Sequence, residues 1–179
     1  MSTGYDLAAK RSEERAERAV KSKIWNSNSD MKVLVINGPN LNLLGEREPN
    51  IYGSDSLIII NIELEKEAKS RGHEIEFTQS NSEGEIIDKL HAARTEFDGV
   101  ILNAGAYTHY SYAIRDAIAA IKIPVIEVHL SNVNSRDEFR KNSVIAPVCL
   151  GSIAGFGKYS YSLAMIALQL LSEEQKGER

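Results

Sequence analysis

The chain has almost no cysteine and no long hydrophobic run. Cys149 is the single cysteine among 179 residues, which excludes an intrachain disulfide framework and a zinc cluster built from cysteines. The longest strictly apolar runs, such as residues 57–60, are far shorter than the roughly 20 residues of a membrane-spanning helix. The N-terminus also lacks the apolar segment of a secretory signal. These absences predict no membrane span and a reducing compartment, with the cytoplasm as the expected location.

Positive charge is scarce as well. The formal net charge is -4 and the isoelectric point is about 5.6, so no basic field attracts a phosphate backbone and nucleic acid is a poor candidate partner. The composition, with 42% apolar and 26% charged residues, is that of a soluble globular chain long enough for one ordinary domain. We therefore expect a small molecule as the first ligand.

The composition changes near Met31. Residues 1–30 contain six Lys/Arg and five Asp/Glu, so the net negative charge comes from the remainder of the chain. Ala16, Val20 and Ile24 follow the i, i+4, i+8 spacing of a weakly amphipathic helix. We interpret this first part as an N-terminal extension, partly helical and dispensable, with a functional arm as the alternative.

After Met31, short β-branched segments alternate with helical patterns. Such βα units predict a parallel sheet with helices on both faces, because each crossover between parallel strands is right-handed. For a unit of this size we expect an α/β fold over residues 31–179, a doubly wound, flavodoxin-like sheet of five strands in the order 2-1-3-4-5. The expected strands are residues 32–37, 73–79, 99–103, 125–129 and 148–153. The expected helices run from a cap at Ser54 or Asp55 to Gly72, and over residues 82–94, 110–121 and 160–171.

The loops after the first, third and fourth expected strands have unusual sequences. Residues 38–53 form a connection far longer than the about 2 to 6 residues usual between strand and helix, and their glycines and prolines indicate a hinged lid. Residues 103–109 and 127–140 hold histidines, asparagines and arginines. Ligands of such sheets bind beyond the carboxyl ends of the strands, at the switch point between the first and third strands. We expect these loops to line one crevice.

A metal site is one alternative for this crevice. Glu127 and His129 share a strand face, and His109 is a possible third ligand. The same loops carry three arginines, which would oppose a cation and favour an anionic ligand. No metal is expected, and a substrate with a carboxylate fits better. The three arginines are Arg47, Arg136 and Arg140.

Nucleotide binding and covalent catalysis are not indicated. Residues 151–158 end in a Gly-Lys pair followed by Tyr159, which differs from a P-loop in loop length and in its missing Ser/Thr, and no Gly-x-Gly-x-x-Gly follows the first strand. No Gly-x-Ser-x-Gly elbow occurs, and Cys149 is expected within an apolar strand. Among the kinds of chemistry considered, proton transfer is the one these loops can still support, with Tyr52 and the histidines as the groups that give or take a proton.

Three motifs in this order resemble the type II 3-dehydroquinate dehydratase family. They are Gly-Pro-Asn-Leu-Asn-Leu-Leu-Gly from residue 38, with Arg-Glu-Pro and Tyr-Gly after it; Asn-Ala-Gly-Ala-Tyr-Thr-His from residue 103; and Glu-Val-His-Leu-Ser-Asn from residue 127. The resemblance covers residues 32 to 171. It implies a flavodoxin-like catalytic domain that reversibly dehydrates 3-dehydroquinate to 3-dehydroshikimate in the shikimate pathway, without a metal or organic cofactor.

The resemblance also implies catalytic roles. Tyr52 is the base, acting as a tyrosinate, and Arg47, together with Arg136 or Arg140, favours that anion. Lowering a phenol pKa from about 10 by about 3 units takes roughly 4 kcal/mol. His129 is the acid that protonates the leaving hydroxyl, and Glu127 orients or charges it. Asn40 holds a water against the developing enolate oxygen.

The substrate contacts are implied in the same way. Asn103 holds the substrate carboxylate together with the backbone amides of Leu130 and Ser131. His109 and Arg140 bind the ring hydroxyls. The full set of expected substrate-binding residues is Asn103, Gly105, His109, Asp116, Leu130, Ser131, Arg136 and Arg140.

An oligomer is implied too. By analogy Asp116 reaches into the site of a neighbouring subunit, and the family forms trimers that assemble into a dodecamer. Residues 57–60 are expected to serve as core and subunit contact, although Ile58 and Ile59 occupy positions that are frequently polar in related sequences. His73 and His91 are expected to be solvated. A non-catalytic binding module of the same shape is the competing class, and a metal hydrolase is a third.

Overall fold

The sheet has the predicted topology. The computed structural model describes residues 30–45 and 55–177. Within them, five parallel strands form one sheet in the order β2-β1-β3-β4-β5. The flavodoxin-like α/β prediction is therefore confirmed. The strands are β1 (Lys32–Asn37), β2 (Glu74–Gln79), β3 (Gly99–Asn103), β4 (Val125–His129) and β5 (Gly151–Ala154).

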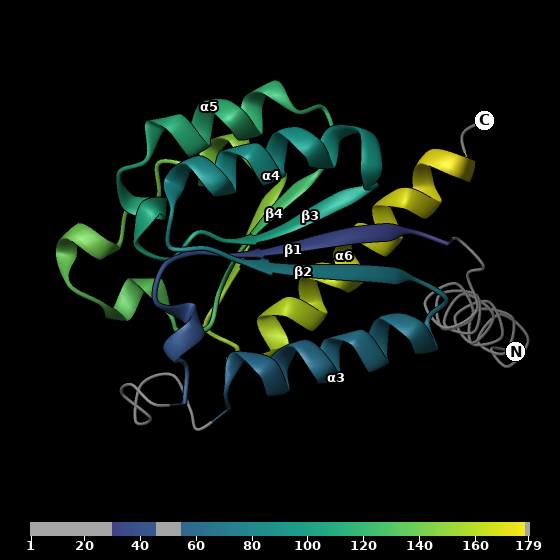
Figure 1. Ribbon diagram of the computed structural model, residues 1–179, viewed down its shortest axis with the longest axis horizontal. Coiled ribbons are helices and arrows are strands. Elements are labelled where there is room, and N and C mark those ends of the chain that lie inside the picture. The colour runs from purple at the N-terminus through teal and green to yellow at the C-terminus, as the bar shows by residue number, and fades with distance from the viewer. Residues whose placement is uncertain (1–29, 46–54, 178–179) are drawn as a thin grey trace, which may run out of the picture.

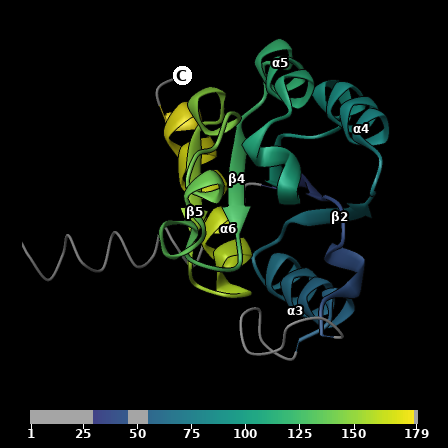
Figure 2. The same cartoon turned by 90° about the vertical axis from the view of Figure 1, so that its left-hand side faces the viewer.

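The long helices lie in two layers, one on each face of the sheet (Figures 1 and 2). One face is covered by α3 (Leu57–Ser70) and α6 (Tyr159–Gly177), and the other by α4 (Glu83–Glu96) and α5 (Tyr112–Ala120). The connections contain short 3-10 turns, namely η1 (Leu41–Leu43), η2 (Gly105–His109), η3 (Val133–Ser135), η4 (Glu138–Arg140) and η5 (Ala146–Val148).

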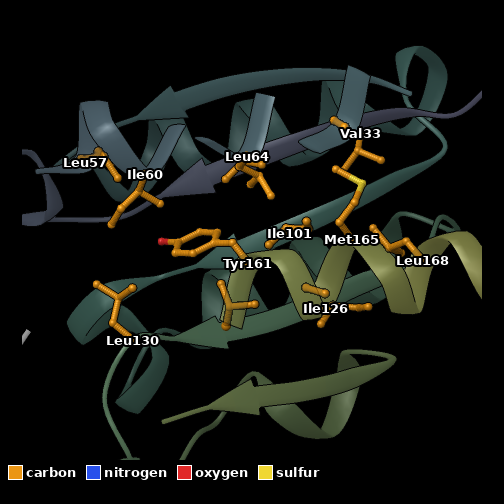
Figure 3. Close-up of a cluster of buried hydrophobic side chains, with 14 of the residues drawn as sticks. Val33, Leu57, Ile60, Leu64, Ile101, Ile126, Leu130, Tyr161, Met165 and Leu168 are labelled. Atoms are coloured by element: carbon orange, nitrogen blue, oxygen red, sulfur yellow. The ribbon is translucent and has the colours of Figure 1, made fainter. Parts of the chain in front are cut away.

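The central strand β1 is buried on both of its faces. Val33 and Val35 pack in the cluster under α3 and α6, whereas Leu34 and Ile36 pack in the cluster under α4 and α5. A continuous apolar run is what a parallel strand between two helical layers requires. Figure 3 shows the first cluster, in which Tyr161 of α6 lies among the aliphatic side chains of α3 and the sheet.

The first long helix starts one residue later than predicted. Its N-cap is Ser56, whose side chain accepts a hydrogen bond from the backbone N–H of Ile59, so the expected cap at Ser54 or Asp55 is wrong. The helix end is as predicted, because Gly72 follows the C-cap with a φ of 79°, a left-handed conformation that glycine adopts without strain. Of the apolar run at its start, Leu57 and Ile60 are buried and residues 58–59 are exposed.

The last strand and the last helix differ from the prediction at their ends. Residues 146–148 form η5 with Pro147 in its first turn, so the strand begins only at Gly151. The backbone N–H groups of Val148 and Cys149 donate to the carbonyls of Ile145 and Ala146 within this turn and are therefore not available to the sheet. Cys149 therefore precedes the strand and is partly buried, and burial raises the pKa of its thiol to about 12. The final helix continues past residue 171 to Gly177, because residues 172–176 contain no helix breaker.

The helix expected over residues 110–121 is α5, and it starts at Tyr112 after a cap by Ser111. His91 is exposed as expected, but the solvated position predicted for His73 is wrong. His73 is buried, and neither of its ring nitrogens has a hydrogen-bond partner within the described residues. Over the same residues, no helix is both long and apolar enough to cross a bilayer.

Candidate active site

The polar residues at the ends of β1, β3 and β4 come together at one edge of the sheet. Asn37, the last residue of β1, pairs with Asn103, the last residue of β3, and Leu102 pairs with Glu127 of β4. Asn37, Asn103 and Glu127 are buried. Buried polar groups at the carboxyl edge of a parallel sheet mark the region where this architecture binds ligands.

Glu127 and His129 form a buried pair on β4. Because strand residues two apart point to the same face, both side chains lie on one side of the sheet. The Nε2 of His129 donates to the Oε1 of Glu127 at 2.9 Å, and the two side chains are 4% and 0% exposed. This bond fixes the ring orientation and directs the other ring nitrogen, Nδ1, away from the carboxylate.

Two hydroxyls complete the surroundings of the Glu127 carboxylate. Thr108 of η2 donates to Oε1, and Ser143, from the loop after η4, donates to the same oxygen at 2.9 Å. Burial alone would raise the pKa of Glu127, but hydrogen bonds from His129 and Thr108, the charge of His129 and the Ser143 hydroxyl outweigh it and lower the pKa below 4.5. The carboxylate is therefore ionised at neutral pH, beside the imidazole.

The loop after β3 is held close to the loop after β1. The backbone N–H of Gly38 donates to the carbonyl of Asn103 at 2.7 Å, and a Cβ at position 38 would lie 2.5 Å from the carbonyl oxygen of Ala104. Gly105 has a φ of 58°, and its backbone N–H donates to the Oδ1 of Asn103 at 3.3 Å. Glycine is required at both places, at position 38 by the close approach and at position 105 by the left-handed φ.

His109 ends η2 with one ring nitrogen engaged. Its Nδ1 is 2.8 Å from the carbonyl oxygen of Asn142, and its Nε2 is buried with no hydrogen-bond partner in the described parts of the chain. The backbone N–H of Val144 donates to the carbonyl of Thr108 at 2.8 Å, so this loop and residues 142–144 are tied together. An orphaned buried nitrogen is a group that a ligand hydroxyl can satisfy.

Asn40 lies in the first loop in a left-handed conformation, with a φ of 67° and an exposed side chain. Its backbone N–H donates to the Oδ1 of Asn81 at 2.9 Å, and Gln79 donates to the carbonyl of Gly38 at 3.2 Å. Tyr107 donates to the carbonyl of Asn81 at 2.8 Å. Sequence reasoning missed Gln79 and Asn81, although they lie at and just beyond the carboxyl end of β2, on the edge where ligands of such sheets bind. It included Tyr107 in the second motif but gave it no role.

The residues after β4 supply backbone amides and arginines. The guanidinium of Arg136 donates to the Oγ of Ser131, with Nε at 2.9 Å, and this holds Arg136 over the strand end. Arg140 is directed elsewhere, since its Nε is 3.8 Å from Asp137 and its guanidinium lies 4.7 Å from the Phe139 ring centroid. The structure thus brings Arg136 to the edge, and Arg140 pairs locally on η4.

Two predicted site residues, Tyr52 and Arg47, lie outside the described residues, and a third, Asp116, stands apart from this edge. Asp116 is exposed on the outer side of α5, on a different element from the crevice. Asp55, the first described residue after that gap, is held 3.1 Å from the Nζ of Lys158 at the start of α6.

The donor set at the edge suits an anion or a proton acceptor better than a cation. Across residues 30–45 and 55–177, no group of three His, Cys, Asp or Glu side chains has the arrangement of a metal site. The Oε1 of Glu127 already accepts three hydrogen bonds, and Nε2 of His129 is one of the donors. An imidazole beside a buried carboxylate can deliver a proton, and nearby amides can hold a carboxylate.

A comparison of sequences identifies relatives of the chain. Residues 31–169 match the family model described as dehydroquinase class II. A 3-dehydroquinate dehydratase of Bacillus cereus (strain AH187) is 58% identical over 137 residues, which are 76% of this chain and 94% of that protein. The match extends over nearly all of that relative.

Solved structures agree. The type II dehydroquinase from Butyrivibrio crossotus DSM 2876 is 54% identical, with a TM-score of 0.77, over 78% of this chain and 98% of that one. The type II dehydroquinase from Propionibacterium acnes is 39% identical, with a TM-score of 0.76, over 79% and 99% of the two chains.

Proposed function

We propose that this chain, which belongs to the class II dehydroquinase family and is a 3-dehydroquinate dehydratase, works through an enolate. The reaction eliminates water from 3-dehydroquinate. In this proposal Tyr52, as a tyrosinate, removes the proton on C2 beside the ketone, and the electron pair moves onto the ketone oxygen. The enolate then collapses, the C1 hydroxyl leaves with a proton from His129, and a carbon–carbon double bond forms. The product is 3-dehydroshikimate, an enone.

The observation that carries the proposal is the Glu127–His129 pair. A general acid must hold a proton close to the leaving oxygen, and the carboxylate of Glu127 holds the imidazole of His129 in one orientation. Glu127 is kept anionic by Thr108 and Ser143. With Nε2 bonded to Glu127, we assign delivery of the proton to the Nδ1 side of His129.

The base requires cationic neighbours, because a phenol is protonated at neutral pH. We assign that role to Arg47, from the same loop as Tyr52, assisted by Arg136. Asn40 has an exposed side chain, and in the proposal it holds a water against the enolate oxygen. Hydrogen bonds aimed at a developing oxyanion replace the metal that other enolising enzymes use.

The remaining residues bind the substrate in this proposal. Asn103 and the backbone amides of Leu130 and Ser131 hold the carboxylate. The orphaned Nε2 of His109 binds a ring hydroxyl. Arg140 contacts the ring after giving up its exposed ion pair with Asp137, a pair of a kind that contributes little stability in water. Gly105 contributes by shaping the loop rather than by a side chain.

We also propose the setting in which the enzyme works. Residues 31–179 form the catalytic domain and residues 1–30 an appended extension. Subunits assemble as trimers into a dodecamer, with the exposed Asp116 reaching a neighbour's site and the exposed Ile58 and Ile59 serving as subunit contact. The enzyme acts in the cytoplasm, in the shikimate pathway towards aromatic amino acids. Sedimentation of the purified chain tests the assembly.

A direct assay tests the function. The purified chain is mixed with 3-dehydroquinate, and the ultraviolet absorbance of the conjugated enone is followed over time. Turnover by the intact chain, abolished in Tyr52→Phe with the circular dichroism unchanged, is the expected result. Tight binding of the acid without turnover would favour the binding-module alternative, and full activity in Tyr52→Phe would refute the assigned base.

A further inference from the structure

We propose that Tyr161 is a positioning residue whose hydroxyl fixes the direction in which the Asn103 amide faces the substrate carboxylate. This inference rests on the proposed function, because it takes Asn103 as a carboxylate-binding group. Tyr161 belongs to the first turn of α6, next to the carboxyl ends of β1 and β3, and neither the motifs nor the catalytic roles above include it.

The Tyr161 hydroxyl joins the ends of two neighbouring strands. The Nδ2 of Asn103, at the end of β3, donates to the hydroxyl oxygen at 2.9 Å, and the hydroxyl donates to the Oδ1 of Asn37, at the end of β1, at 2.6 Å. The tyrosine is 1% exposed. Figure 3 shows its ring within the aliphatic cluster and its oxygen pointing towards the end of the sheet at which the strand arrows terminate.

Gly105, at one end of this chain of hydrogen bonds, determines which group donates and which accepts in each bond. The backbone N–H of Gly105 can only donate, and it donates to the Oδ1 of Asn103. The NH₂ group of Asn103 must therefore face Tyr161, whose oxygen accepts one of its two hydrogens. The single hydrogen of Tyr161 then goes to Asn37, which can accept it. Burial raises the pKa of Tyr161, so the phenol keeps that hydrogen.

The result is an amide with one hydrogen left for a ligand. The Nδ2 of Asn103 carries a second N–H, and its position is determined once the first N–H and the Oδ1 are both bonded. A planar carboxamide can reverse by rotating half a turn, which would present an acceptor oxygen to an anionic ligand. Tyr161 and Gly105 together prevent that reversal, because a reversed amide would face Gly105 with a donor.

Asn37 shows how strongly this arrangement is enforced. It is completely buried, and its Nδ2 has no hydrogen-bond partner among the residues of the described structure. Rotating the Asn37 amide would offer that Nδ2 to the Tyr161 oxygen, but Tyr161 would then have to donate to Asn103 and turn it round. The structure instead keeps the direction that leaves Asn103 as a donor.

Steady-state kinetics of Tyr161→Phe provide the first test. The substrate carboxylate is unchanged during the reaction, so the enzyme binds it equally strongly in the ground state and in the transition state. Losing the hydrogen bond from Asn103 to this carboxylate therefore raises KM without lowering kcat. We expect KM to rise about tenfold, equivalent to about 1.4 kcal/mol, with kcat within about twofold of the wild type. Tyr159→Phe, an exposed tyrosine on the same helix, is the matched control and leaves both constants unchanged.

A second variant keeps the tyrosine and removes only its acceptor. In Asn37→Leu the hydroxyl of Tyr161 has lost its acceptor, and only the long 3.3 Å hydrogen bond from Gly105 still opposes reversal of the Asn103 amide. Reversal then gives the Tyr161 hydrogen a new acceptor, the Oδ1 of Asn103, so we expect KM to rise although the hydroxyl is still present. In an Asn103→Ala background, Tyr161→Phe has no further effect on KM if it acts through Asn103. Thermal unfolding of each variant identifies any that has lost its fold.

Calorimetric measurement of ligand affinity distinguishes a role of Tyr161 in carboxylate binding from a merely structural role. The probes are 3-dehydroshikimate and its methyl ester, which lacks the negative charge. Tyr161→Phe and Asn37→Leu are expected to weaken binding of the acid about tenfold and to leave binding of the ester unchanged. Equal loss for acid and ester, an unchanged KM, or additive effects with Asn103→Ala would overturn the inference. If the wild type binds the acid but does not turn over, the proposed function fails while this comparison still decides the role of Tyr161.

Discussion

The imidazole of His129 and the carboxylate of Glu127 are joined by a 2.9 Å hydrogen bond on one face of β4, and both are closed off from solvent. Within the described residues, only one oxygen of the carboxylate accepts hydrogen bonds. Oε1 accepts from His129, Thr108 and Ser143, and Oε2 is buried without a partner in the structure as described. The three donors to Glu127 are thus gathered on the oxygen that the imidazole contacts.

The first prediction concerns proton delivery. His129→Ala removes the acid, and we expect kcat to fall by about 10² to 10⁴, the usual contribution of general acid catalysis. Glu127→Gln keeps the shape and removes the charge, so we expect a smaller fall in kcat. The enone assay measures both. His91→Ala, an exposed histidine on α4, is the control, and an equal fall there would show that the effect is not specific to the pair.

The second prediction concerns acid stability. The folded pKa of Glu127 is lowered, so its stabilising contribution is present above the unfolded value of about 4.5 and is lost as the pH falls through the folded value. Thr108→Val removes one of the lowering hydrogen bonds, so the folded and unfolded pKa values approach each other. We expect the loss of stability below about pH 4.5 to become shallower in this variant.

Thermal unfolding between about pH 3 and pH 7 measures that slope. Thr95→Val, which removes an exposed hydroxyl on α4, is the matched control and keeps the wild-type slope. A slope in Thr108→Val identical to that of the wild type would mean that the hydroxyl does not help to hold Glu127 ionised.

The third prediction concerns the close approach of two loops. Gly38→Ala places a Cβ 2.5 Å from the backbone oxygen of Ala104, which cannot move aside as a flexible side chain would. We expect a loss of about 1–3 kcal/mol in the free energy of unfolding, the usual cost of overpacking, together with lower activity because both site loops shift. Gly151→Ala is the control, since its Cβ would meet nothing within 4 Å. Urea unfolding of the two variants is compared, and equal stability would contradict the prediction.

The fourth prediction concerns metal removal. The proposed steps use only protein groups and the substrate, so dialysis against a chelator such as EDTA is expected to leave kcat and KM unchanged. The enone assay before and after dialysis measures this. Loss of activity that returns on adding a divalent cation would instead support the metal alternative built on Glu127, His129 and His109.

The sequence predicted the strands best where they are buried on both faces. The bounds of β1, β3 and β4 are as expected, because a central parallel strand is a short, nearly continuous apolar run between turn residues. It predicted the start of β5 poorly, since residues 148–150 are as apolar as a strand, whereas the N–H groups of Val148 and Cys149 close the turn of η5 instead of pairing with β4. His73 was misjudged because its burial depends on packing by distant residues.

The local motifs also located Glu127, His129 and Asn103, whose places follow from strand ends and the spacing of two. The sequence by itself therefore determined the sheet order and the edge where chemistry occurs. Tertiary structure alone decided which groups surround them. Thr108 is 19 residues from Glu127 in sequence, and Tyr161 is 124 residues from Asn37. Such contacts depend on how the helices and loops pack after folding, and no short-range periodicity contains that information.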